Sequence, residues 1–129
     1  MLKGYIEGYY GRLFSQEERS LLLRHMGKLK MDFYLYGPKE DPYHRVLWEK
    51  PYPSKYEKVL EDFVKQSKKN KIRPVFAISP GLKSNKSTAH YRKFLAIKIK
   101  QAKRLGFEEF AIFFDCLLYT SPSPRDALE

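Results

Sequence analysis

Hydrophobic and polar positions along the chain alternate between strand-like and helix-like patterns. Four short apolar runs have strand character: residues 4–8, 33–36, 74–79 and 110–114. Apolar residues recur at helical spacing between these runs, after capping-box sequences at Ser15–Glu18 and Ser54–Glu57 and again from Thr88 to Leu105. The pattern predicts strands and helices in the order βαβαβαβ.

Each predicted helix has an apolar face that we expect to turn inward. The faces are Leu22, Met26 and Leu29 in the first helix, Val59, Leu60, Phe63 and Val64 in the second, and Leu95, Ile99 and Ala102 in the third. Gly106 is expected to end the third helix, since glycine readily adopts the left-handed conformation found after helix C-termini. Lysine-rich stretches at 65–71 and 93–103 are interpreted as solvated outer helix faces.

Continuously apolar strands separated by helices indicate a parallel sheet. Two architectures fit this order, a doubly wound sheet and part of a (β/α)8 barrel. A dinucleotide-binding sheet would place G-x-G-x-x-G after its first strand, and the turn at residues 7–11 reads E-G-Y-Y-G instead.

Noteworthy residues fall at or just after the ends of the predicted strands: Gly8, Lys39, Ser79 and Asp115. Barrel enzymes place their chemistry at this carboxyl edge of the strands. The long polar segment from Lys39 to Pro53 is a βα loop, so we expect it on the same face of the molecule.

Composition narrows the class of protein. The chain has 129 residues, 43% hydrophobic and 31% charged, as expected of one folded domain rather than a disordered or fibrous segment. The net charge of +10 invites a nucleic-acid partner, but no nucleic-acid-binding motif is present, so we expect none. The single Cys116 excludes an internal disulfide, and the histidines His25, His44 and His90 lie in different elements, so no metal is expected.

No apolar run approaches the ~20 residues of a membrane span, and the first residues lack the apolar core of a signal peptide. We therefore expect no membrane partner and, by default, a cytoplasmic location. The oligomeric state is left open.

The pattern breaks abruptly after Asp115. Read as codons, residues 116–126 are similar to a translated transposase-based sequencing adapter. We therefore predict that residues 1–115 are a partial catalytic barrel and that residues 116–129 are a non-native, disordered tail. A whole barrel needs roughly 250 residues. We expect the parent gene to encode Asp at position 116 and to continue through the rest of the barrel.

Four motifs in order resemble glycoside hydrolase family 84, the O-GlcNAcase and hyaluronidase-like β-N-acetylglucosaminidases. They are G-Y-I-E-G-Y-Y-G at 4–11, Y-L-Y-G-P-K-E-D-P-Y-H-R at 34–45 with Trp48 and 51–53 continuing the match, A-I-S-P-G at 77–81, and F-F-D at 113–115. Departures are mild at residues 13–14, Gly37 and Glu40. A serious one is Cys116, which stands where the family has a second catalytic Asp.

The resemblance implies the N-terminal half of a (β/α)8 TIM-type barrel and a retaining hydrolase in which the 2-acetamido group of the sugar attacks the anomeric carbon. It implies no cofactor and a glycan or glycoprotein partner that carries N-acetylglucosamine. Whether that substrate is a glycoprotein, chitobiose-type or hyaluronan-derived is left open.

By the same resemblance, Asp115 polarises the acetamido group, Lys39 hydrogen-bonds sugar hydroxyls, and the Gly8 backbone carbonyl contacts the sugar. The second carboxylate, which protonates the leaving oxygen, has no counterpart here. We therefore expect this chain alone to be inactive.

Each assignment has a plainer alternative. Asp115 could cap a helix, Lys39 could be an ordinary loop lysine, and Gly8 could be a turn glycine. Glu7 is expected to make internal hydrogen bonds and His44 to anchor the loop, as is Arg45.

The aromatic residues Tyr9, Tyr10, Trp48 and Tyr52 could stack on sugar or pack under the loop. The alternative function is a non-catalytic basic α/β module that binds polyanions or glycans.

Overall fold

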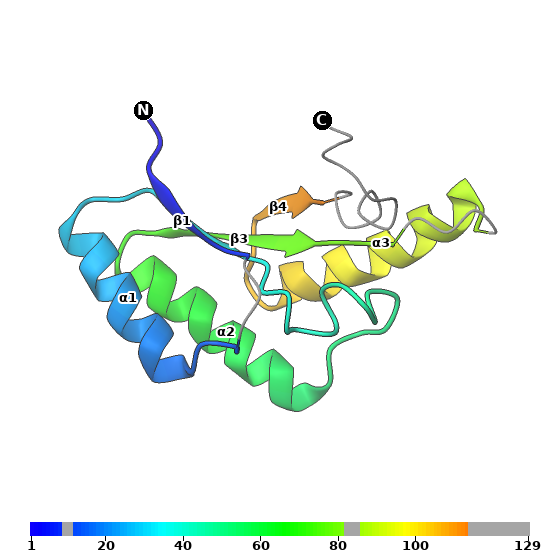
Figure 1. The fold of residues 1–129 in the computed structure, drawn as a ribbon, viewed down its shortest axis with the longest axis horizontal. Coiled ribbons are helices and arrows are strands. Elements are labelled where there is room, and N and C mark those ends of the chain that lie inside the picture. Colours follow the sequence, from blue (N-terminus) through cyan, green and yellow to red (C-terminus); the bar gives the residue numbers. More distant parts are fainter. Residues whose placement is uncertain (9–11, 82–85, 114–129) are drawn as a thin grey trace.

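The computed structural model describes residues 1–8, 12–81 and 86–113. Strands and helices alternate as expected (Figure 1): β1 (Gly4–Glu7), α1 (Gln16–Lys28), β2 (Phe33–Tyr36), α2 (Ser54–Lys69), β3 (Arg73–Ile78), α3 (Thr88–Arg104) and β4 (Glu109–Ile112). The order βαβαβαβ is confirmed. β2 has its predicted bounds, and the ends of the other three strands lie within two residues of the predicted ones.

The strand order decides between the two architectures left open by the sequence. The sheet is parallel throughout and its strands lie in the order β1-β2-β3-β4, so each strand pairs with the next one in the chain. A doubly wound sheet reverses direction at a switch point, and this sheet does not. A succession of right-handed crossovers in one direction puts the helices on one face, which is the arrangement of a (β/α)8 barrel.

One face of the sheet packs against the helices. Tyr34 and Tyr36 of β2 and Phe76 of β3 are buried there. The Tyr34 ring meets Phe63 of α2 with 4.8 Å between centroids, and the Phe76 ring lies 5.2 Å from Phe107, just after α3. Helices α1 and α2 lie side by side against this face (Figure 1). The aromatic core thus ties the helices to the middle strands.

The opposite face of the sheet has no helix among the described residues. Ile6, Leu35 and Val75 lie in register across β1, β2 and β3 on this face. Ile6 is 56% exposed and the other two are half-buried. In a barrel this is the face that turns toward the interior.

One of the two predicted capping boxes is present. Ser15 caps α1 by accepting from the Glu18 backbone N–H, while the Glu18 side chain accepts from the Ser15 N–H. The box predicted at Ser54 is wrong, because Pro53 is the N-cap of α2 and makes no side-chain cap bond. Its presumed partner Glu57 instead accepts from Gln101 and Arg104 of α3.

Two predicted helix faces also need correction. In α1 the buried positions are Arg19, Leu23 and Met26, whereas Leu29 is 69% exposed. In α3, Ala102 is buried as predicted, but Lys98 is also buried, at 1% exposure. The interpretation of residues 93–103 as a wholly solvated lysine face is therefore wrong at Lys98.

Gly106 ends α3 as predicted. Its φ of 113° lies in the region that favours glycine, and a Cβ there would approach Val64 Cγ1 to 2.8 Å. Among the described helices, none is long and apolar enough to cross a membrane.

Candidate functional site

The carboxyl ends of the strands meet around Gly37, directly after β2. A Cβ on Gly37 would lie 3.0 Å from Ala77 Cβ, 3.3 Å from His44 Cε1 and 3.4 Å from Phe113 Cε2. A Cβ on Gly8 would lie 3.8 Å from the Gly37 carbonyl oxygen. The edge therefore brings together the residues that follow β1 and β2, the end of β3 and the residue after β4.

Lys39 begins the long loop two residues beyond Gly37 and is half-buried. Burial lowers the pKa of His44, and the positive charges of Lys39 and Arg45 lower it further. Gly8 and Lys39, both predicted for sugar binding, lie at the same edge of the sheet.

His44 anchors the loop to the end of β3. Its Nδ1 lies 2.7 Å from the Ala77 carbonyl oxygen, and its own carbonyl accepts from the Ser79 N–H at 2.8 Å. Because a carbonyl only accepts, Nδ1 must carry the proton. His44 and Ser79 are both buried. The expected anchoring role of His44 is confirmed.

Asp41 is the buried centre of the loop, and sequence reasoning missed it. Its Oδ2 accepts from the hydroxyls of Tyr36 at 2.6 Å and Tyr52 at 2.7 Å. Its Oδ1 accepts from the backbone N–H groups of Tyr43 at 2.8 Å and His44 at 3.2 Å. Burial, followed by the Asp41 charge, raises the pKa of both tyrosines. The D-P-Y sequence, a turn signal, was the available clue.

A second buried carboxylate, that of Glu7, belongs to the last residue of β1. Glu7 accepts two hydrogen bonds from the Arg19 guanidinium, each 2.9 Å long, and one from the Tyr34 hydroxyl at 2.8 Å. Burial lowers the pKa of Arg19, but the hydrogen-bonded Glu7 together with the neighbouring Tyr36 and Tyr34 raises it above its ordinary value. The internal role expected of Glu7 is confirmed.

The loop also packs against α3. Trp48 is buried and stacks on Tyr91 with 5.6 Å between centroids, and the Glu49 carboxylate pairs with the His90 ring. Tyr52 is buried as well. For Trp48 and Tyr52 the packing interpretation is therefore the one the structure favours. Tyr9 and Tyr10 lie outside the described residues.

Asp115 and Cys116 also lie outside the described residues, so the predicted catalytic role of Asp115 stays a prediction. The strand that leads to them is placed, because the Phe113 N–H donates to the Ile78 carbonyl at 2.9 Å. In the described part of the chain, no three His, Cys, Asp or Glu side chains are grouped so that they could hold a metal ion.

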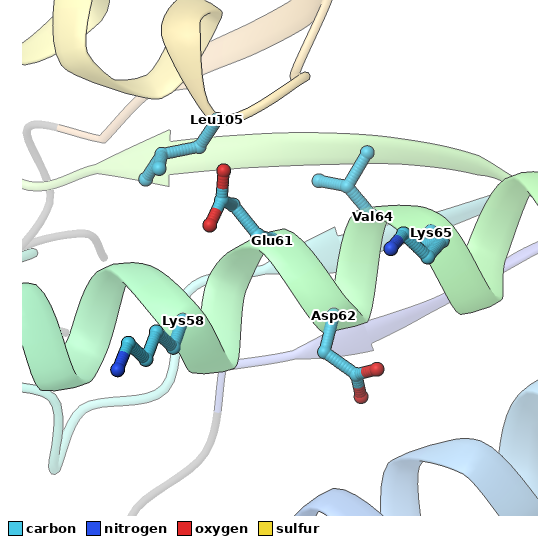
Figure 2. A pocket seen from close by; sticks show the side chains of 6 residues that line it. All are labelled: Lys58, Glu61, Asp62, Val64, Lys65 and Leu105. Carbon is cyan, nitrogen blue, oxygen red and sulfur yellow. The ribbon is translucent and has the colours of Figure 1, made fainter.

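A groove of about 450 Å³ lies elsewhere, along α2 (Figure 2). Its lining is mostly charged: Lys58, Glu61, Asp62, Val64, Lys65 and Leu105. Asp62 points toward α1 and accepts from Gln16. None of the lining residues comes from the carboxyl edge, so this groove is separate from the site around Gly37.

Known proteins match this chain across nearly its whole length. A family profile described as beta-N-acetylglucosaminidase matches residues 3–126. Protein O-GlcNAcase from Rattus norvegicus and from Mus musculus are each 34% identical over 114 residues, which is 88% of this chain and 12% of theirs.

A solved structure, titled "Structure of CpGH84B", superposes with a TM-score of 0.81 at 38% identity, over 88% of this chain and 21% of that one. The chain therefore spans only a small part of each of these relatives. With a family match that extends over most of its residues, it belongs to the β-N-acetylglucosaminidases of glycoside hydrolase family 84.

Proposed function

We propose that this chain supplies part of the catalytic barrel of an enzyme that removes terminal N-acetylglucosamine from a glycan or glycoprotein with retention of configuration. The observation that carries the proposal is the family match over residues 3–126, joined to a sheet whose carboxyl edge gathers Gly8, Gly37 and the Lys39 loop. Barrel enzymes bind substrate at that edge.

Gly8 and Lys39 would bind the sugar. A residue without a side chain at position 8 leaves its backbone carbonyl approachable by a sugar ring, and the Lys39 ammonium group would donate to sugar hydroxyls. The loop that carries Lys39 is held by the buried Asp41 and His44. Such support keeps a charged donor at a fixed position, as a binding site requires.

Asp115 would act on the acetamido group of the substrate. Its carboxylate would accept from the acetamido N–H as the acetamido oxygen attacks the anomeric carbon and positive charge develops on the nitrogen. A second acid must then protonate the leaving oxygen. Cys116 has a thiol with an ordinary pKa of ~8.5, a poor substitute for a carboxylic acid. The 129-residue chain alone would therefore not turn over substrate.

A hybrid enzyme tests the proposal. Residues 3–115 of this chain would replace the matching segment of the rat relative, whose own sequence then continues from position 116. We expect the hybrid to hydrolyse an aryl N-acetyl-β-glucosaminide. Failure of a correctly folded hybrid to do so would contradict the proposal.

Within the hybrid, Lys39→Ala is the decisive variant. Removing a charged hydrogen-bond donor costs ~1.5–3 kcal/mol, so we expect kcat/KM to fall by about tenfold to a hundredfold. Lys50→Ala is the matched control, since Lys50 is an exposed lysine of the same loop. Equal kcat/KM values for the Lys39 variant and the Lys50 control would exclude the binding role of Lys39.

A further inference from the structure

The least expected group in the molecule is the ammonium group of Lys98, in the middle of α3. The residue is 1% exposed. Its Nζ donates to the Tyr43 carbonyl at 2.7 Å and to the Lys50 carbonyl. It also lies over two aromatic rings, 4.5 Å from the Tyr52 centroid and 5.8 Å from that of Tyr43. Lys98 thus holds two distant points of the loop between β2 and α2.

These bonds continue to the start of the loop. The Tyr43 N–H donates to the Asp41 carboxylate, and the Asp41 N–H donates to the Pro38 carbonyl at 3.1 Å. Pro38 is bonded covalently to Lys39. A short chain of contacts therefore runs from α3 to the lysine proposed to bind sugar.

Gln101, one turn further along α3, fixes the far end of the same loop. Its side chain donates to the Tyr52 carbonyl at 3.0 Å and accepts from the Tyr52 N–H at 2.8 Å. Lys98 and Gln101 together bond backbone groups of Tyr43, Lys50 and Tyr52, which lie outside the strands and helices. The loop is thus tied to α3 at several points, in addition to the contacts of His44 with the end of β3.

A buried lysine is costly unless its charge is compensated. Here two carbonyl oxygens and two ring faces surround it. Burial lowers the pKa of Lys98 to about 8, against the opposing effect of Asp41. An apolar side chain would fill the same space but would leave the Tyr43 and Lys50 carbonyls without this donor.

We infer that Lys98 is a positioning residue for the proposed reaction: by clamping the loop to α3 through the Tyr43 and Lys50 carbonyls, it fixes Lys39 at the carboxyl edge of the sheet. This inference rests on the sugar-binding role proposed for Lys39. Its structural half, that Lys98 clamps the loop, can be tested independently of activity.

Hydrogen exchange measured by mass spectrometry on the full 129-residue chain tests the clamp. Lys98→Met and Lys98→Gln should raise the exchange rate of amides in residues 40–50 at least tenfold and leave α1 unchanged. Lys100→Met is the control, because Lys100 is exposed on the same helix and should change neither region. Unchanged loop exchange in a folded Lys98 variant would overturn the clamp.

If both Lys98 variants unfold, the clamp can still be tested by titrating the Lys98 side chain in the unmodified chain. The Lys98 side-chain resonance should titrate below the ordinary lysine pKa of ~10.4, because burial between the loop and α3 lowers the pKa of this group to about 8. A Lys98 that titrates at the ordinary lysine value overturns the clamp.

Kinetics in the hybrid enzyme test the consequence for Lys39. Misplacing a binding group by about 1 Å can cost up to ~10²-fold in rate, so Lys98→Met should lower kcat/KM by about tenfold to a hundredfold. In a Lys39→Ala background the same change should cost almost nothing further. A merely structural residue would lower activity equally in both backgrounds, and such additivity would overturn the positioning role.

The two proposals fail in different ways. If Lys39→Ala leaves the hybrid unaffected, the binding role of Lys39 is wrong, and with it the catalytic consequence of Lys98. If Lys39→Ala is damaging but Lys98→Met adds its full effect independently, the proposed function stands and the positioning inference is wrong.

Discussion

His44 shows how one buried side chain couples the site to solution pH. Its Nδ1–H donates to the Ala77 carbonyl, and burial together with the Lys39 and Arg45 charges lowers its pKa. A group with a lowered folded-state pKa is protonated first in the unfolded state as pH falls. His44 therefore contributes stability that is present above the unfolded pKa of about 6.5 and is lost as pH falls through its folded value.

We predict that the free energy of unfolding decreases from pH 7 to pH 5 and that His44 accounts for part of the decrease. The measurement is a set of urea titrations of the unmodified chain and of His44→Asn across this range. His25→Asn is the control, because His25 is exposed. A His44 ring that titrates at or above the ordinary pKa in a nuclear magnetic resonance experiment would contradict the prediction.

The roles of single residues were predictable from sequence where the residue belongs to a motif next to a predicted strand, even when its partner is far away in sequence. The anchoring of His44 and the internal bonding of Glu7 were expected, because polar groups near buried strands need partners. Lys98 was missed because a lysine-rich helix is usually solvated, and its partners Tyr43 and Lys50 lie far away in sequence. Its position three residues after Leu95 and four before Ala102, within the apolar stripe, was the available clue.

At the scale of elements, Ser15 and Ser54 stand at the starts of α1 and α2 but differ in their contribution to helix capping. Ser15 is the N-cap of α1, whereas Ser54 is the first helical residue of α2 and makes no cap bond. Ser15→Ala should lower the free energy of unfolding by ~1 kcal/mol, while Ser54→Ala should change it by a few tenths at most. Thermal melts of both variants measure this, and equal losses would contradict the assignment of the caps.

The failure at Ser54 has a physical cause. Local sequence offered the same S-x-x-E pattern twice, but Pro53 occupies the extended N-cap position of α2 and Glu57 bonds Gln101 and Arg104 of another helix. The Glu57 side chain, which the local pattern predicted to cap α2, therefore makes a tertiary contact with α3 instead. Element order, by contrast, was predictable because it depends on summed periodicity over many residues.

At the scale of the whole molecule, the uncovered sheet face is the feature with the clearest consequence. Ile6 is 56% exposed beside Leu35 and Val75. We expect this face to drive concentration-dependent self-association of the 129-residue chain. Ile6→Lys should reduce the weight-average sedimentation coefficient at high concentration.

Leu21→Lys provides the control for that experiment, since Leu21 is 49% exposed on a helix rather than on the sheet. It should leave association unchanged. A wild-type chain that sediments as a monomer at every concentration would show that the sheet face does not self-associate.

The strand order also bears on how the chain folds. Because β1 pairs with β2, β2 with β3 and β3 with β4, each βα unit finds its partner in the next unit to leave the ribosome. Pairing between consecutive strands keeps the sequence separation of contacting residues, the contact order, lower than in a sheet where strands pair out of sequence order. Proteins with lower contact order fold faster. The sheet can thus form in the order of synthesis, from β1 to β4. Each new strand pairs with the strand that precedes it in the chain, so β4 is the last of the four to be added.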